Sequence, residues 1–238
     1  MFYFLLPALM SYNYILIIAA VIPAVFLMVR VYQLDRLERE SPYLVWKLIR
    51  AGIFSSLIAM VAERVLSVIL KASVNDRGIY NILLYFVIVA FSEEGAKYYL
   101  MRKNTWSSWE FNCQYDGIVY AVFVSLGFAL WENISYVMHF GFSTAIVRAV
   151  TAIPGHTCFG VFMGLFYGLA RKYENGEMRE KAKLYSILAV IIPALLHGAY
   201  DYIASVGVSA WYFVGFIAIL FTMSYFIAVK MSRQDTYI

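Results

Sequence analysis

The sequence contains little charge. Asp, Glu, Lys and Arg make up 14% of its 238 residues, whereas a soluble domain carries roughly 25%. Hydrophobic residues account for 63% of the chain, and the mean hydropathy is +0.71. This shortage of charge excludes an ordinary soluble domain, and we expect an integral membrane protein.

Cysteine is also scarce, and the sequence features that are typical of several other protein classes are missing. Cys113 and Cys158 show no zinc-type spacing and provide no disulfide framework. The chain has no internal repeats and no glycine-rich phosphate loop. Its net charge of +4 follows from membrane topology, so we expect no nucleic-acid partner. Because the first positive charge, Arg30, follows the first apolar run, we expect a retained helix there and not a removed signal peptide.

Long apolar runs divide the chain into spans. A helix needs about 20 apolar residues to cross the bilayer, and the runs lack the strict alternation of barrel strands. Helices are therefore the expected spans. We predict an all-α fold, a multi-pass membrane helical bundle with about seven transmembrane helices in a single domain over residues 1–238. The predicted spans are approximately 10–31, 46–70, 79–101, 115–138, 143–170, 184–205 and 209–230.

Basic residues alternate between the connections. They gather in 30–50, at 102–103, in 171–183 and after residue 229, whereas the opposite connections hold only Lys71 and Arg77. Lys and Arg are enriched on the cytoplasmic side of membrane proteins. We therefore predict a protein of the cell membrane, in contact with membrane lipids, with its amino terminus outside and its carboxyl terminus in the cytoplasm.

The third predicted span contains the most unusual stretch. Glu93, Glu94 and Lys97 interrupt an apolar run from Ile79 to Met101. Ionisable groups at membrane depth are costly and normally face a protein interior or a water-filled cavity. On a helix, Lys97 lies on the same side as both carboxylates and offsets part of their charge. A buried structural ion pair is the plain alternative, but we favour chemistry or transport.

The next three spans also carry polar groups. Glu132 lies among apolar residues with Asn133 beside it. In the fifth span, His156 and three glycines recur every four residues, a spacing that lets a neighbouring backbone approach. In the sixth, His197 and Asp201 stand four residues apart, so that the carboxylate can orient the imidazole. We expect these groups to share one polar cavity.

Two arginines inside spans are expected to be structural. Arg64 has Glu63 beside it near the outer end of the second span, and Arg148 lies near the outer interface. Snorkelling to the membrane surface, or a structural ion pair, accounts for both better than catalysis does.

Four motifs on successive predicted helices point to a family. They are Glu93-Glu94-Gly-Ala-Lys97 (EExxK), Phe128-Ala-Leu-Trp-Glu132-Asn133 (FxxxEN), His156 with its trailing glycines, and His197-Gly-Ala-Tyr-Asp201 (HxxxD). In this order they resemble the PrsW family of intramembrane proteases, which is related to the CAAX-type prenyl-protein proteases and the bacterial immunity proteins of that fold. The resemblance runs from about Pro23 to Asp201.

The resemblance implies a protease domain and a substrate class. Members cleave a single-pass membrane protein, and the founding role is the first, extracytoplasmic-side cut of an anti-sigma factor in envelope-stress signalling. The catalytic residues that it implies here are Glu93, Glu94, Glu132, His156, His197 and Asp201, supported by Lys97 and Asn133.

Two mechanisms stay open at this point. In the favoured one, which needs no cofactor, Glu93 or Glu94 activates water, and His197 assists or stabilises the oxyanion. In the other, a divalent metal such as zinc is held by His156, His197 and Glu132, with the Glu93–Glu94 pair as base.

Two other functions are alternatives to proteolysis. A transporter or channel could use the same carboxylates and histidines to relay protons or hold a cation, although no inverted repeats favour it. A catalytically dead scaffold is the other alternative.

One geometric difficulty concerns depth. Glu94 lies seven residues before the predicted end of its span, about 10 Å along a helix. Glu132 lies a similar distance from the opposite membrane face. A shared site therefore requires tilted helices or a third span that continues past Arg102.

Overall fold

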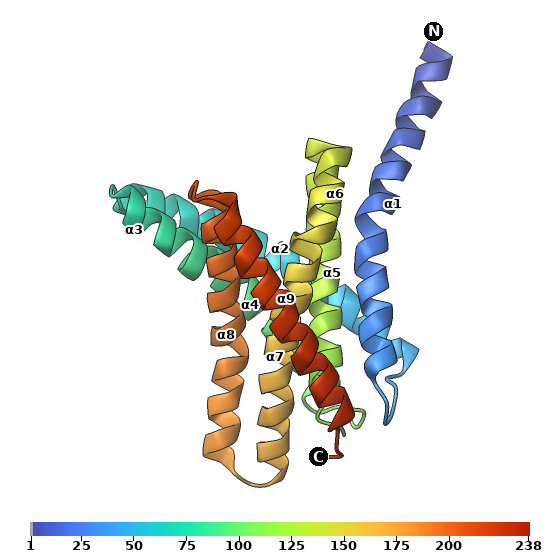
Figure 1. The fold of residues 1–238 in the computed structure, drawn as a ribbon, viewed down its shortest axis with the longest axis vertical. Coiled ribbons are helices and arrows are strands. Elements are labelled where there is room, and N and C mark those ends of the chain that lie inside the picture. Colours follow the sequence, from blue (N-terminus) through green and yellow to red (C-terminus); the bar gives the residue numbers. More distant parts are fainter. Residues whose placement is uncertain (1) are drawn as a thin grey trace.

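The computed structural model describes residues 2–238, with side chains described from residue 14 onward (Figure 1). Helices follow one another along this part of the chain, and an isolated bridge between Cys113 and Tyr237 is the only β-type pairing there. The elements are α1 (Phe2–Leu34), α2 (Pro42–Ser73), α3 (Arg77–Ile82), η1 (Leu83–Val89), α4 (Ala90–Thr105), α5 (Asp116–Phe140), α6 (Phe142–Val150), α7 (Ala152–Asn175), α8 (Arg179–Ser205) and α9 (Ala210–Arg233).

Seven helical segments are long and apolar enough to cross a membrane. The third consists of α3, the π-helical segment η1 and α4 in one run from Arg77 to Thr105, and the fifth combines α6 and α7. The prediction of an all-α, multi-pass bundle is confirmed. Most of the observed segments extend beyond the predicted ranges, because polar residues at their ends continue the helical hydrogen bonding.

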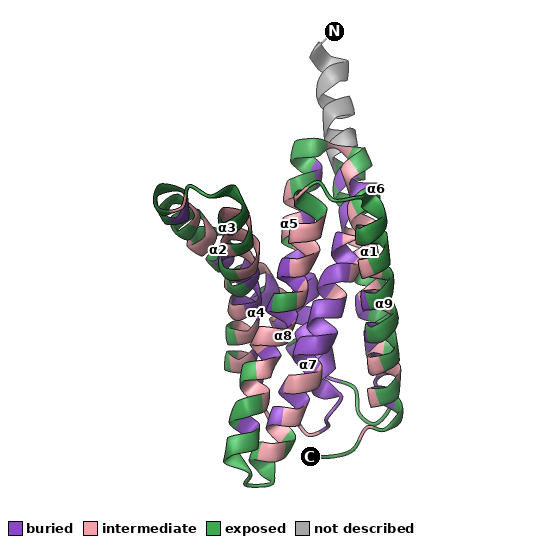
Figure 2. Cartoon of the chain, turned by 60° about the vertical axis from the view of Figure 1, so that its left-hand side comes forward, coloured by how far each residue is buried: buried purple, intermediate pink, exposed green. Residues whose placement is uncertain are grey.

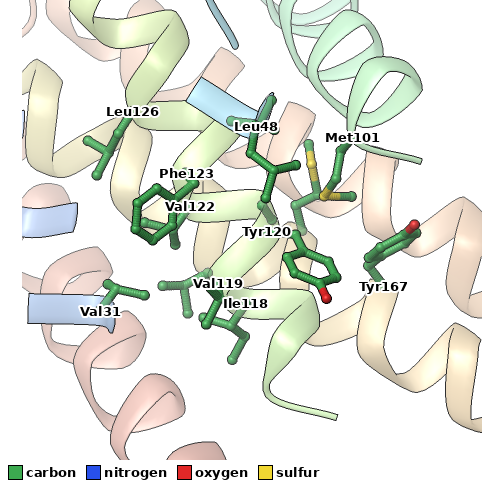
Figure 3. Packing of buried hydrophobic residues seen from close by; sticks show 14 of the residues in the cluster. Val31, Leu48, Met101, Ile118, Val119, Tyr120, Val122, Phe123, Leu126 and Tyr167 are labelled. Atoms are coloured by element: carbon green, nitrogen blue, oxygen red, sulfur yellow. The ribbon is translucent and has the colours of Figure 1, made fainter. Parts of the chain in front are cut away.

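Helix α5 forms the centre of the bundle. Every residue from Asp116 to Ala129 is buried. Figure 3 shows side chains of this helix, among them Tyr120 and Phe123, near Leu48, Met101 and Tyr167 from three other helices. A helix that is apolar on all sides and packed on all sides provides a rigid frame for its neighbours.

The predicted glycine stripe packs against this central helix. A Cβ atom on Gly164 would lie 2.4 Å from the carbonyl oxygen of Gly117, and one on Gly168 would lie 2.3 Å from that of Gln114. Both distances are far shorter than a van der Waals contact, so a side chain at either position would force α5 and α7 apart. The prediction that these glycines permit close backbone approach is confirmed.

The loops that carry most of the basic residues gather at one end of the bundle. The α1–α2 loop, the segment before α5, the α7–α8 turn and the carboxyl terminus all lie at the lower end in Figure 1. The carboxyl-terminal residues pair with the segment before α5, where the amide of Gln114 donates to the carbonyl of Thr236 and the amide of Ile238 to that of Asn112. The compartment that this end faces stays a prediction.

At the opposite end, α2 and α3 lean away from α5 and α6. Figure 2 shows them diverging above α4, and the exposed side chains on these segments are largely apolar, as expected of helices that face lipid.

Candidate functional site

The acidic pair of the third span is fully enclosed. Glu94 and Lys97 have no exposed surface, and Glu93 is 6% exposed. Lys97 Nζ donates to Glu94 Oε1 over 2.7 Å and to Glu93 Oε2 over 3.2 Å. It also lies 3.9 Å from the centre of the Phe128 ring. The predicted side-chain grouping on this helix is therefore present, because a helix brings residues three and four positions apart together.

The lysine connects the third span to the fifth. Its ammonium group lies 3.2 Å from His156 Nδ1, and His156 Nε2 lies 2.9 Å from Glu132 Oε2. An ammonium group can only donate, so Nδ1 accepts and the Nε2–H donates to the Glu132 carboxylate. His156 thereby bridges α4 and α5 from its position on α7.

Arg148 completes this side of the site. Its Nη2 donates to Glu132 Oε2 over 2.8 Å, and its Nε donates to Asn133 Oδ1 over 2.9 Å. Asn133 in turn donates to the carbonyl of Ala20, which anchors it to α1. Arg148 therefore forms an ion pair, as one of the two expected explanations required, and this pair lies inside the polar site; its purely structural role stays a prediction.

The sixth span supplies the other imidazole. His197 Nδ1 lies 2.9 Å from Glu94 Oε1 and 3.8 Å from Glu93 Oε2. On the other side of the ring, Nε2 lies 3.5 Å from Asp201 Oδ2. Asp201 lies on the same helix face as His197, as predicted, but the 3.5 Å contact is too long for a hydrogen bond, and the hydrogen bond of this imidazole goes to Glu94.

These contacts form one continuous chain across four spans. The chain runs from Asp201 through His197, Glu94, Lys97, His156 and Glu132 to Arg148. The sequence placed Glu94 close to one membrane face and Glu132 close to the other. In the structure, α4 continues to Thr105, eleven residues beyond Glu94, so Glu93 and Glu94 lie deeper than the predicted span suggested and can meet the residues of the other spans. The π-helical segment η1 ends directly before this helix, and such segments are frequent at functional sites.

A cavity of about 580 Å³ opens beside this chain. Glu93, Glu132, His156, His197 and Asp201 line it, whereas Glu94 and Lys97 lie behind its wall. Its lining also includes Thr151 directly before α7 and Ser205 at the end of α8, so the cavity extends towards the ends of these helices that lie away from the α7–α8 turn. Water that enters this cavity would reach Glu93 before it reached Glu94.

Glu63 also lines this cavity, although none of the sequence motifs indicated it. Of the two explanations expected for Arg64, the ion pair with Glu63 is not found among the described side chains, and snorkelling stays a prediction. Adjacent residues on a helix point in different directions, so Arg64 is exposed while Glu63 is half-buried on the cavity wall. The signal that could have found it was an acid at membrane depth without a cation on its own helix face.

The residues present fit a divalent metal ion. Glu93, Glu94, His156 and His197 each place one donor atom within 4.8 Å of the others. Glu94 Oε2 is buried and has no hydrogen-bond partner in the described part of the chain. Imidazoles together with carboxylates form the donor set of catalytic zinc. Glu132, which was predicted as a ligand, lies outside this set and instead bonds His156 from the far side of its ring.

A family comparison matches residues 40–229, with the description "PrsW family intramembrane metalloprotease". The chain belongs to the PrsW family. Its relatives include Protease PrsW of Bacillus subtilis, 32% identical with 82% of this chain and 85% of that protein covered. Protease PrsW of Clostridioides difficile is 34% identical, covering 79% and 78%, and that of Shouchella clausii is 30% identical, covering 92% and 97%. No solved structure matches the chain.

Membership in the PrsW family bears on the choice between a protease and a transporter. It supports an intramembrane protease in a multi-pass membrane location and does not favour a transporter. The family description also names a metalloprotease, and this counts against the metal-free mechanism that we favoured from the sequence. The description alone leaves open which residues of a PrsW protein would hold the ion.

Proposed function

We propose that the protein is an endopeptidase that hydrolyses a peptide bond of a single-pass membrane protein within the bilayer. The observation that carries this proposal is the continuous chain of acids and imidazoles on the wall of one cavity. Hydrolysis at membrane depth requires a place for water, a base and groups that stabilise an oxyanion. The cavity has a polar lining, and Lys97 behind its wall balances the charge of the acids, so we propose that this one site meets all three requirements.

The two adjacent glutamates receive different roles. Glu93 lines the cavity, so we assign it the proton that the attacking water gives up. Glu94 is shut off from the cavity between Lys97 and His197, and we assign it the positioning of both. Lys97 balances the negative charge of the pair, and its 0% exposure keeps water from screening that charge.

The opposite wall would hold the oxyanion and the leaving group. Both imidazoles line the cavity, and each is hydrogen-bonded to a carboxylate, His156 to Glu132 and His197 to Glu94, while Asp201 lies 3.5 Å from the other nitrogen of His197. Such partners fix the tautomer and the direction of the N–H bond. Arg148 and Asn133 hold Glu132 in turn. We assign His197 the stabilisation of the developing charge.

We further propose that the cluster of Glu93, Glu94, His156 and His197 holds a divalent metal ion, in place of the metal-free mechanism favoured from sequence. Glu93 and His197 would then be ligands, and the base and oxyanion roles given above would apply only to the protein without metal. The family description and the unpaired Glu94 Oε2 support this proposal. When bound, zinc would polarise the scissile carbonyl and acidify water. Lys97 contacts three of the four residues, so its ammonium group and the ion would compete for the same donor atoms.

We also propose a side of cleavage, from the predicted topology, and a substrate class, from the family resemblance. The cavity opens at the end of the bundle away from the basic loops, which the distribution of Lys and Arg places outside the cytoplasm. A cut on that side suits the first step of a signalling cascade. We therefore propose an anti-sigma factor-like protein as substrate, on the resemblance to the family's founding role.

Co-expression with candidate single-pass substrates tests the enzyme proposal. We expect cleavage by the unmodified chain and none by Glu93→Ala, Glu94→Ala or His197→Ala. Glu180→Ala, an exposed acid at the start of α8, is the matched control. Full cleavage by all three site variants would disprove the assignment.

Metal analysis of the purified protein tests the second proposal separately. Stoichiometric zinc that is lost in His156→Ala and His197→Ala would support it, together with inhibition by a chelator. Cleavage by protein that contains no metal would exclude it and restore the glutamate mechanism.

A further inference from the structure

A second group of buried acids lies at the basic end of the bundle, where a loop meets the first residue of a membrane span. Asp35 and Glu40 belong to the loop between α1 and α2, and Asp116 begins α5. Each offers one carboxylate oxygen, and these three oxygens lie within 4.8 Å of one another. The residues are 3%, 5% and 1% exposed, so that water has little access to them.

The contacts of this cluster do not balance its charge. Asp116 Oδ2 accepts hydrogen bonds from the amides of Asn112 and Cys113, over 3.0 and 2.7 Å. In contrast, neither carboxylate oxygen of Asp35 has a hydrogen-bond partner among the described residues. Within that part of the chain, no Lys, Arg or His makes an ion pair with any of the three acids. Buried like charges without a cation repel one another and lose their hydration.

The electrostatics of the loop acids reflect this lack of compensation. Burial raises the pKa of Asp35 to about 6, with the nearby charge of Asp235 adding to the effect, while the charge of Arg39 and the backbone amide of Glu38 offset only part of it. Burial, followed by the charge of Asp116, raises the pKa of Glu40 to about 9. The group therefore needs either protons or a cation from solution to be stable.

We propose that Asp35, Glu40 and Asp116 form a binding site for a hard divalent cation, Mg²⁺ or Ca²⁺. Carboxylate oxygens are the preferred ligands of these ions, and the cluster contains no imidazole or thiol that would favour zinc. The unpaired, buried carboxylate of Asp35 is the feature that points to a ligand and not to an internal partner.

A cation here would join two segments that are far apart in the sequence, at a place where a third segment also packs. It would connect the α1–α2 loop to the start of the central helix α5. The carboxyl-terminal tail lies against the same place, because Ser232 Oγ donates to the carbonyl of Leu34 and Asp235 Oδ1 accepts from the amide of Tyr115. Asp235 Oδ2 is itself buried without a partner in the described structure. The site would stabilise the end of the bundle opposite the cavity.

Cation titration of the full chain in detergent tests this proposal. After treatment with a chelator, the protein is titrated with Mg²⁺ or Ca²⁺, and binding is followed by calorimetry and by the thermal unfolding midpoint. We expect saturable binding and a raised midpoint for the unmodified chain. Asp35→Asn should weaken the affinity at least about 10-fold, since it removes one of three charged ligands.

Two control variants distinguish binding at this site from binding elsewhere on the protein. Glu180→Gln makes a comparable charge change at an exposed position of the same end and should leave the affinity unchanged. His197→Ala alters the intramembrane donor set and should also leave it unchanged. Glu40→Gln serves as the second ligand variant if Asp35→Asn does not fold.

The proposal would be overturned by any of three results. The unmodified chain could show no cation binding, which would mean that the acids share protons instead. Asp35→Asn and Glu40→Gln could bind as tightly as the unmodified chain. The binding could disappear in His197→Ala, which would place it at the intramembrane site.

Discussion

The protein buries two groups of acids, and they differ in how their charge is balanced. Inside the membrane, Glu93 and Glu94 both pair with the ammonium group of Lys97, and Glu132 pairs with the guanidinium group of Arg148. At the end of the bundle, Asp35, Glu40 and Asp116 converge without a basic partner among the described residues. Most of these acids are almost fully removed from solvent.

The difference shows what each group requires from outside the chain. The intramembrane group is held in place by its own cations and by two histidines, so its carboxylates are oriented before a substrate arrives. Such preorganisation is what electrostatic catalysis needs. The loop group can be stable only when an ion or protons from solution join it. Substitutions that remove one charged side chain from either group are therefore the most direct test of the comparison.

Removal of Lys97 should give the largest effect. Lys97→Met keeps most of the length of the side chain but leaves two buried carboxylates without their cation, which costs about 3–5 kcal/mol of folding free energy. Reversible unfolding in mixed detergent would measure it, and cleavage should be lost as well. Lys103→Met, on the exposed side of the same helix, is the matched control. A change below about 1 kcal/mol, on the order of a surface pair, would contradict the assignment of charge balance to Lys97.

Separation of Glu132 from Arg148 should come next. Glu132→Gln removes the charged acceptor for both His156 and Arg148, and we expect cleavage to fall about 100-fold, as for other positioned acid–base groups. Arg148→Gln tests the other partner. The double variant should lose less stability than the sum of the two single losses, because neither charge is then left alone. Recovery of cleavage in the double variant would mean that the pair is structural only.

Removal of the Asp201 charge should lower cleavage less than the substitution of Glu132 does. Asp201→Asn removes a charge that lies 3.5 Å from Nε2, and partners that orient an imidazole typically contribute about 10-fold or somewhat more. The pH profile of cleavage should move while KM stays the same. A change in KM alone would place Asp201 in substrate binding.

Neutralisation of one acid in the loop group should give the smallest change, and it should raise the stability of the protein where the other substitutions lower it. Asp35→Asn removes an unsatisfied buried charge, so the chain should become more stable by about 1 kcal/mol in the presence of a chelator. The same variant should lose the stabilisation that Mg²⁺ or Ca²⁺ provides. Destabilisation under both conditions would show that Asp35 has a partner within the protein.

The membrane architecture and the polar residues of the cavity could be predicted from the sequence. Span number follows from the length of apolar runs, because the bilayer sets that length. The contacts of Lys97 with Glu93 and Glu94 follow from helix geometry, since residues three and four positions apart always share a face. The candidate catalytic residues were visible because acids and histidines are rare at membrane depth.

Other features of the site depend on how the helices pack. Lys97 and His156 are 59 positions apart, so no local rule brings Nζ to within 3.2 Å of Nδ1. The place of Glu63 on the cavity wall and of Glu132 outside the donor set depend on the rotation of α2 and α5 about their axes. Periodicity predicts which residues share a face but not which neighbour that face meets.

The loop acids show this limit most clearly. In the sequence, Asp35 and Glu40 belong to a short polar connection of the kind that is normally solvated, and Asp116 is separated from them by more than one full span. The sequence by itself determined the number of spans, the residues at membrane depth and the pairing within each helix, because bilayer thickness and helix pitch are constant. Only the tertiary structure decided which acids meet and which lack a cation, because burial of a charge depends on every segment that packs around it.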